Sequence, residues 1–187
     1  MTNGSTLKVA GISGSLRKGS TNSAAIRAAI ELAPSGMTIE QIGIGDLPLY
    51  NDDIRVEGYP PSVRNYREKI AAADAVLFAT PEFNYSVSAP LKNAIDWGSR
   101  VPDPPYNGKP IGIISASVSP LGGVRAQYHL RHMCVSLNGF VMNTPQVYIG
   151  EAPKKLDADF KLVDPAMREA IAQFLAAFKE FALRFKR

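Results

Sequence analysis

The chain has 187 residues, of which 45% are hydrophobic and 20% charged, a balance typical of a soluble globular protein. Its net charge of +4 favours anionic ligands but is too small and too scattered to indicate a nucleic-acid partner. A single cysteine excludes an intramolecular disulfide, and no stretch has the length and apolarity of a membrane span. We therefore expect one cytoplasmic domain over residues 1–187, with no membrane partner.

The first predicted unit is a strand, a loop of small residues and a helix. The apolar run 7–12 is typical of a buried strand, and the alanine-rich segment 23–33 is typical of a helix. In the first loop, residues 13–22, glycines allow a close backbone approach and hydroxyls can donate hydrogen bonds. The N-terminus of the helix adds free N–H groups and a positive dipole end. This pattern predicts a phosphate site; a polar turn with a helix N-cap is the alternative.

The residues of the first loop exclude the common nucleotide motifs. Gly14 and Gly19 have the spacing of a Walker A loop, but Ser20 stands where the lysine should be. The glycines also fail the spacing of the dinucleotide fingerprint. Arg17 provides one guanidinium among hydroxyl and amide groups, which suits a terminal phosphate monoester. The predicted phosphate ligands are Ser15, Arg17, Ser20, Thr21 and Asn22.

A second strand is predicted over residues 37–44, followed by a long irregular connection over residues 45–61. Long loops in compact domains are often functional, so this connection is a candidate border of the site. Asp52 and Asp53 lie in it, and an acidic pair can bind a metal or transfer protons. The proline-rich context favours solvated turn residues instead.

A second loop, residues 80–86, follows a helix predicted over 62–73 and an apolar strand predicted over 75–79. It lies at the carboxyl end of a strand, where open α/β sheets bind ligands. Pro81 stiffens the loop, Phe83 and Tyr85 offer flat faces, and Asn84 offers donors and an acceptor. These groups suit a planar heteroaromatic ring; a surface loop with a small apolar cluster is the alternative.

The remaining chain continues the alternation of helices and strands. We predict a helix over 89–98, a strand over 111–116, a helix over 124–137, a strand over 140–147 and a final helix that begins at 164–165. A third loop, residues 117–123, again follows a strand. His129 and His132 share a helix face, but no partner completes a tetrahedral metal site, so we predict no metal. Cys134 is predicted to be a core residue.

The order of these elements predicts the fold. Five strands alternate with helices, and right-handed connections bring the loops after the first, third and fourth strands to one edge of the sheet. We predict a flavodoxin-like three-layer α/β/α sandwich with a five-stranded parallel sheet in the order 2-1-3-4-5. No serine, cysteine or carboxylate arrangement typical of nucleophilic or acid–base catalysis is evident, and we name no catalytic side chain.

Three motifs, at residues 14–22, 80–87 and 90–97, resemble the NADPH-dependent FMN reductase family, in particular its soluble quinone and chromate reductase branch. The resemblance covers residues 8–147. It implies an FMN cofactor and ping-pong hydride transfer from NADPH or NADH to a small-molecule acceptor. Quinones are the expected acceptors, with chromate, azo and nitro compounds as further candidates. The alternatives are a flavodoxin-like electron-transfer protein without reductase activity of its own and a regulatory protein that has lost the flavin.

The resemblance also implies the cofactor site and the assembly. Phe83 stands where the family usually has tyrosine, which removes a hydroxyl that relatives can use. A homodimer or homotetramer is implied, with Tyr85, Arg125 and Tyr128 as contacts between subunits; alternatively, Arg125 and Tyr128 are simply exposed helix residues. The implied flavin contacts are Ser15, Leu16, Arg17, Ser20, Thr21, Asn22, Pro81, Glu82, Phe83, Asn84, Tyr85, Ser117 and Gly122.

Overall fold

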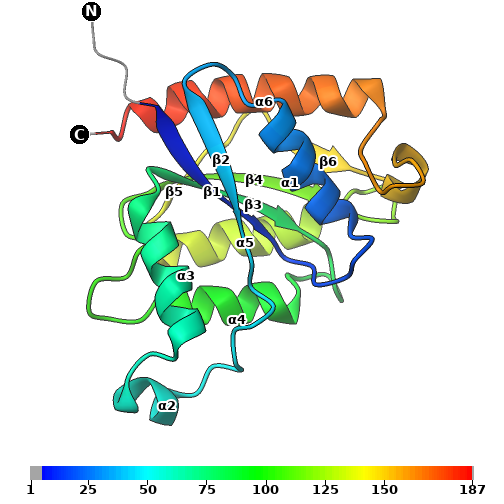
Figure 1. The fold of residues 1–187 in the computed structure, drawn as a ribbon. Coiled ribbons are helices and arrows are strands. Elements are labelled where there is room, and N and C mark those ends of the chain that lie inside the picture. The colour runs from blue at the N-terminus through cyan, green and yellow to red at the C-terminus, as the bar shows by residue number, and fades with distance from the viewer. Residues whose placement is uncertain (1–5, 187) are drawn as a thin grey trace, which may run out of the picture.

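A computed structural model describes residues 6–186 as one parallel sheet covered by helices on both faces (Figure 1). The sheet order is β2-β1-β3-β4-β5, which confirms the predicted topology, and a further strand, β6, also pairs with β4. The strands are β1 Leu7–Ser13, β2 Met37–Ile42, β3 Ala75–Thr80, β4 Pro110–Ala116, β5 Phe140–Val141 and β6 Val147–Ile149. The helices are α1 Thr21–Glu31, α2 Asp52–Glu57, α3 Pro61–Ala72, α4 Ala89–Gly98, α5 Val124–Ser136 and α6 Pro165–Leu183, with a 3₁₀ turn η1 at Ala152–Lys155.

Alternation along the strands divides the core into two layers. Leu7, Val9 and Leu77 point toward α1 and α6, whereas Ile12 and Phe78 point toward α3, α4 and α5. Strands β3 and β4 are buried along their whole length, as expected for central strands of a sheet that is covered on both faces. Both cores are apolar, so hydrophobic burial on two sides fixes the register of the sheet.

Helix ends follow the capping residues in the sequence. The Ser20 hydroxyl accepts the Ser23 N–H at the start of α1, and Ser88 does the same for Leu91 in α4. Asp164 caps α6 through the Met167 N–H, 2.9 Å away. These caps fix where each helix begins, and for α1 and α4 that point lies beside the predicted loops.

The structure corrects two predictions. The expected strand over 140–147 is two short strands, because Pro145 has no N–H to donate to β4 and the chain bulges between Val141 and Val147. The connection predicted as irregular over 45–61 contains helix α2. Asn51 caps it, and Asp52 and Asp53 in its first turn complement the helix dipole.

No helix within the described part of the chain has the length and apolarity needed to cross a membrane.

One buried polar pair in the core gives a stability prediction. The hydroxyls of Tyr66 and Tyr106 are hydrogen-bonded to each other, both side chains are fully buried, and burial raises the pKa of each phenol. Replacing one tyrosine by phenylalanine leaves the other hydroxyl buried without its partner. We expect Tyr66→Phe or Tyr106→Phe to lower the free energy of unfolding by about 1–3 kcal/mol.

The double variant Tyr66→Phe/Tyr106→Phe should cost clearly less than the sum of the two single changes, because no unpaired hydroxyl remains. Urea unfolding of all four proteins measures this coupling. Simple additivity of the two costs would contradict the interpretation.

Candidate functional site

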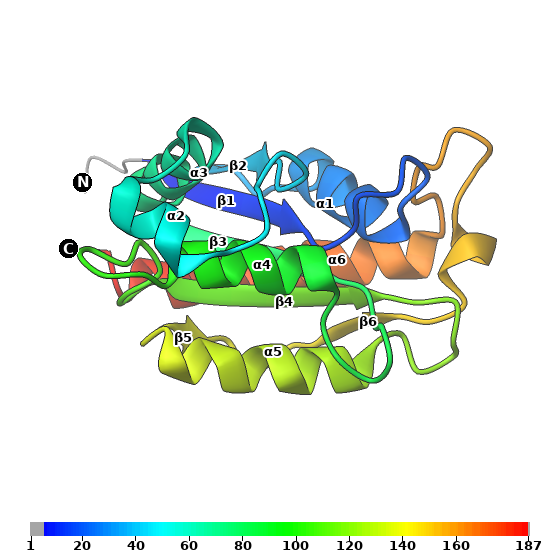
Figure 2. The ribbon, with the colours of Figure 1, turned by 90° about the horizontal axis from the view of Figure 1, so that it is seen from below.

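A cleft of about 210 Å³ lies at the carboxyl ends of β1, β3 and β4, where the three predicted loops meet. In Figure 2 these ends lie on the side of the sheet where the chain enters α1. Ala116 and Val118 are two lining residues that the sequence analysis missed, and they directly flank the predicted Ser117. The cleft is lined by Ser15, Arg17, Ser20, Thr21, Asn22, Pro81, Glu82, Phe83, Ala116, Ser117 and Val118. Four predicted residues lie outside this lining, namely Leu16, Asn84, Tyr85 and Gly122.

The first loop presents unpaired backbone donors at the start of α1. Within residues 6–186, the N–H groups of Gly19, Thr21 and Asn22 have no hydrogen-bond acceptor. They lie where the positive end of the α1 dipole adds to their attraction for an anion. Arg17 is exposed and donates to the Gly19 carbonyl at 3.1 Å, so its guanidinium stays close to these donors. This arrangement is suited to a phosphate group.

The side chain of Asn22 has a different role from the predicted one. Its amide donates to the Ala116 carbonyl at 2.9 Å and accepts from the Ala116 N–H at 3.0 Å. Both polar atoms of the side chain are therefore used inside the protein, which leaves the backbone N–H of Asn22 as its donor toward the cleft. The pair joins the first loop to the end of β4, 94 residues along the chain.

The first and second loops are in close contact. A Cβ atom at Gly14 would lie 2.9 Å from Cδ of Pro81 and 3.1 Å from a side-chain carbon of Leu91, so only glycine fits there without displacement. Ser88 also donates a hydrogen bond to the Gly14 carbonyl. The phosphate donors and the predicted ring-binding loop are thus held together by packing as well as by polar contacts.

The second loop is a tight hairpin. Phe83 and Ser86 exchange two backbone hydrogen bonds of 2.9 Å, and Asn84 and Tyr85 between them have φ values of 50° and 65°. Left-handed backbone at a tyrosine is strained, and strain of this kind concentrates in functional loops. The Tyr85 ring is exposed and lies 4.2 Å from the Arg125 guanidinium. Contact of Asn84 and Tyr85 with a flavin stays a prediction.

Glu82 lines the cleft, but its carboxylate is directed toward α5. It accepts hydrogen bonds from the backbone N–H of Arg125 at 3.0 Å and of Ala126 at 3.3 Å, and it pairs with the Arg125 guanidinium at 3.2 Å. The charge of Glu82 is therefore neutralised by Arg125 and the α5 dipole. Its own backbone N–H has no acceptor in the described chain, which makes this group a candidate donor toward a bound ring.

The third loop is fixed by a buried network. The Ser115 hydroxyl donates to the Gly122 carbonyl at 2.6 Å, and the Gln127 amide donates to Ser115 at 2.9 Å and to the Val147 carbonyl at 2.8 Å. Gly122 has a positive φ of +61°. It is not among the residues that line the cleft. Its structural importance is clear, because it shapes the loop that carries Ser117.

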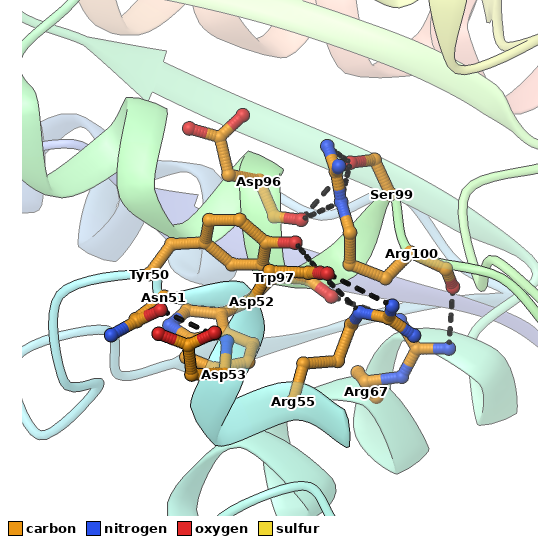
Figure 3. A network of polar contacts seen from close by, with 10 residues as sticks. All are labelled: Tyr50, Asn51, Asp52, Asp53, Arg55, Arg67, Asp96, Trp97, Ser99 and Arg100. Carbon is orange, nitrogen blue, oxygen red and sulfur yellow. Dashed lines mark hydrogen bonds and ion pairs between the residues drawn. The ribbon is translucent and has the colours of Figure 1, made fainter.

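The other candidate residues are used elsewhere. Asp52 bonds to Arg55 at 2.6 Å and to the Tyr50 hydroxyl at 2.7 Å, contacts that lower the pKa of its carboxyl to about 2 (Figure 3). His129 contacts Ser86 at 3.1 Å. Cys134 is buried, which raises the pKa of its thiol to about 12. Across residues 6–186 there is no group of His, Cys, Asp and Glu side chains that suits a metal ion.

Comparison with known proteins shows the family of the chain. Residues 7–154 match the model of the NADPH-dependent FMN reductase family. The chain belongs to this family. It is 51% identical to an NAD(P)H-dependent FMN reductase of Pseudomonas aeruginosa over 180 residues, covering 96% of this chain and 97% of that one. It is 43% identical to the quinone reductase of Escherichia coli K12 over 183 residues, covering 96% and 97% of the two chains.

A solved structure extends the comparison. The flavoenzyme NAD(P)H:(acceptor) oxidoreductase of Paracoccus denitrificans superposes with a TM-score of 0.87 at 33% identity, covering 96% of this chain and 98% of that one. The fold is therefore shared with this flavoenzyme over nearly the whole chain.

The residues present fit the cofactor of an FMN reductase. Free N–H groups at the start of α1 and the Arg17 guanidinium match a phosphate monoester, and the free N–H of Glu82 matches an acceptor at the edge of a ring. Phe83 provides an aromatic surface at the cleft, half exposed to solvent. Phosphate and ring contacts are thus both available in one cleft.

The geometry of the third loop gives a prediction with an internal control. A Cβ atom at Gly122 would lie 2.8–2.9 Å from backbone atoms of Tyr148, Ile149 and Gly150, whereas a Cβ at Gly108, with φ +73°, would meet nothing within 4 Å. Both alanine variants pay about 1 kcal/mol for left-handed backbone. Gly122→Ala should cost about 1–3 kcal/mol more, because the backbone has to move.

The free energies of unfolding in urea measure this difference, with Gly108→Ala as the matched control. Equal destabilisation by the two variants would show that crowding at the third loop has no effect on stability.

Proposed function

We propose that the protein is an FMN-dependent NAD(P)H oxidoreductase that reduces quinones, with chromate, azo and nitro compounds as further candidate acceptors. The observation that carries this proposal is the cluster of free N–H groups and Arg17 at the start of α1, which lines the same cleft as Glu82 with its free N–H. Bound FMN supplies the transfer of a hydride from NAD(P)H to an acceptor. The family and its named FMN and quinone reductases support the same reaction.

The chain's own residues bind and orient in this proposal. Arg17 and the amides of Thr21 and Asn22 hold the phosphate, and Pro81 and Phe83 border the ring. The cleft is open and smaller than the 300–1,000 Å³ usual for enclosed ligand sites, so one face of a bound ring stays accessible. NAD(P)H and the acceptor would use this same face in turn, which is the basis for proposing ping-pong kinetics.

Assembly into a homodimer or homotetramer is part of the proposal. Leu49, Val56 and Val101 are large apolar residues that are 82%, 68% and 68% exposed, and they lie on or beside α2 and the end of α4. Tyr128 and Val135 expose a second apolar surface on α5. Contact with another copy of the chain would cover such side chains, and light scattering measures the resulting mass.

The direct test is the visible spectrum of the purified protein with added FMN, before and after NADPH under nitrogen. We expect a bound-flavin spectrum that NADPH bleaches and that a quinone restores without any partner protein. Binding of FMN with no NADPH oxidation would favour an electron-transfer protein instead. Failure to bind FMN would contradict a flavin-dependent function altogether.

The role of Arg17 gives a quantitative prediction. Arg17→Ala removes the cation nearest the free N–H groups, and a hydrogen bond to a charged group contributes about 1.5–3 kcal/mol. We expect FMN affinity to fall about 10- to 100-fold, whereas the affinity for riboflavin, which lacks the phosphate, should not change.

Lys18→Ala is the matched control, because Lys18 carries the same charge in the same loop and its side chain has no partner in the described structure. Titration of each protein by quenching of flavin fluorescence measures the affinities. Equal losses in the two variants would show a general charge effect rather than a contact of Arg17 with phosphate.

A further inference from the structure

A hairpin between η1 and α6 lies against the first loop, and the proposed function does not yet use it. Leu156 and Leu162 form an antiparallel bridge at its base. The Asp157 carboxylate accepts hydrogen bonds from the N–H groups of Asp159 at 3.0 Å and Lys161 at 2.8 Å. Figure 2 shows this segment beside the loop that enters α1. Its tip is therefore held in one conformation by its own hydrogen bonds.

The tip residue, Phe160, packs directly on Gly19. A Cβ atom at Gly19 would lie 2.6 Å from Cε1 and 2.8 Å from Cζ of the Phe160 ring. The ring is absent from the residues that line the cleft, so it supports the first loop from the outer side. Gly19 immediately precedes the Ser20 cap of α1, next to the free N–H groups of Thr21 and Asn22.

The hairpin is attached to the helices on that face of the sheet. Arg27 in α1 donates to the Phe160 carbonyl at 2.7 Å. Arg168 in α6 donates to the Leu162 carbonyl at 3.1 Å and pairs with Glu31 of α1 at 3.0 Å. The ring is thus fixed relative to α1, the helix whose N-terminus would bind the phosphate.

The conformation of Phe160 points to a role beyond burial. Its φ is +56°, a strained region for an aromatic residue, and its side chain is still 49% exposed. Because about half of the side chain is exposed, its burial contributes little hydrophobic stabilisation. Strained residues persist where the surrounding structure imposes their conformation. In this conformation the Phe160 ring lies against Gly19.

We propose that Phe160 is a positioning residue of the flavin site. By supporting Gly19 from outside, it holds the free N–H groups of the first loop in the arrangement that binds phosphate, and so it raises the affinity for FMN. This inference rests on the proposed function. A ligand group held by preorganised donors loses affinity when the supporting residues are removed.

The test compares FMN with riboflavin, because the two differ by the phosphate alone. Apoprotein is titrated with each flavin, and fluorescence quenching gives the affinities. We expect Phe160→Ala to weaken FMN binding about tenfold, the lower end of what loss of an orienting residue costs at metal sites. Riboflavin affinity should stay unchanged, and Phe160→Tyr should restore FMN affinity because it keeps the ring.

Phe140→Ala is the matched control, since Phe140 is 44% exposed and stacks on Phe185 at the opposite end of the sheet. It should change neither affinity. A purely structural role of Phe160 predicts equal losses for FMN and riboflavin, and that result would overturn the proposal. An unchanged FMN affinity in Phe160→Ala would overturn it as well.

Gly19→Ala provides an independent second variant. Its Cβ would displace the Phe160 ring, so it should weaken FMN binding by a similar factor, and Gly19→Ala/Phe160→Ala should be no weaker than either single variant. Multiplied losses in the double variant would contradict the contact. If the wild type binds no FMN, the proposed function fails too; if it binds FMN and Phe160→Ala has no effect, this inference alone fails.

Discussion

The site depends on the pair of hydrogen bonds between the Asn22 side chain and the backbone of Ala116. The Asn22 amide bonds to both backbone polar groups of Ala116, the last residue of β4, much as a neighbouring strand would. It thereby joins the start of α1 to the start of the third loop. The Asn22 backbone N–H remains free for a ligand because it lies in the first turn of α1, where no intrahelical acceptor is available. One residue thus sets the spacing of two loops and contributes a donor to the cleft between them.

Around this pair, the first loop keeps basic side chains available, because neither Arg17 nor Lys18 forms an ion pair within the described residues. Glu82 is neutralised by Arg125 and by the first N–H groups of α5, so it brings little negative field into the cleft. Arg17 has a carbonyl as its partner and keeps its full charge near the free N–H groups. An anionic ligand would therefore meet donors and a cation without a competing carboxylate, which supports the proposed phosphate site.

Most of the fold could be predicted from the sequence because its signals are local. Apolar runs of strand length, serine caps and small-residue loops mark the order of elements, and the handedness of parallel connections then determines which loops meet. The division of one predicted strand at Pro145 and helix α2 were missed, since both depend on how short segments pair or pack. Local sequence patterns do not determine whether a short segment forms a strand, a helix or a loop when tertiary contacts decide between them.

The sequence predicted which loops form the candidate site, but not the contacts that their side chains make. Nine of the predicted flavin residues line the cleft, yet the side-chain partners of Asn22 and Glu82 lie 94 and 43 residues away and have no sequence signal. Gly122 and Phe160 show the same limit. Gly122 packs against the backbone of residues 148–150 and Phe160 packs against Gly19, and only the fold brings these groups together.

Contacts made by the fold explain how a solvent-accessible site can still hold its binding groups in fixed positions. Apart from Arg17, the groups proposed to bind the ligand are backbone N–H groups, whose positions follow from the helix and strand ends that carry them, so little side-chain entropy would be lost on binding. Close packing at Gly14, Gly19 and Gly122 restricts the positions of these ends, and the same packing keeps Tyr85 and Phe160 in strained left-handed backbone. Ligand binding would in turn stabilise the fold, by about 2.7 kcal/mol at a hundredfold excess over Kd, which is comparable to the roughly 1–3 kcal/mol that one strained residue costs. Under the proposed function, a bound cofactor would therefore offset the strain that its own binding site contains.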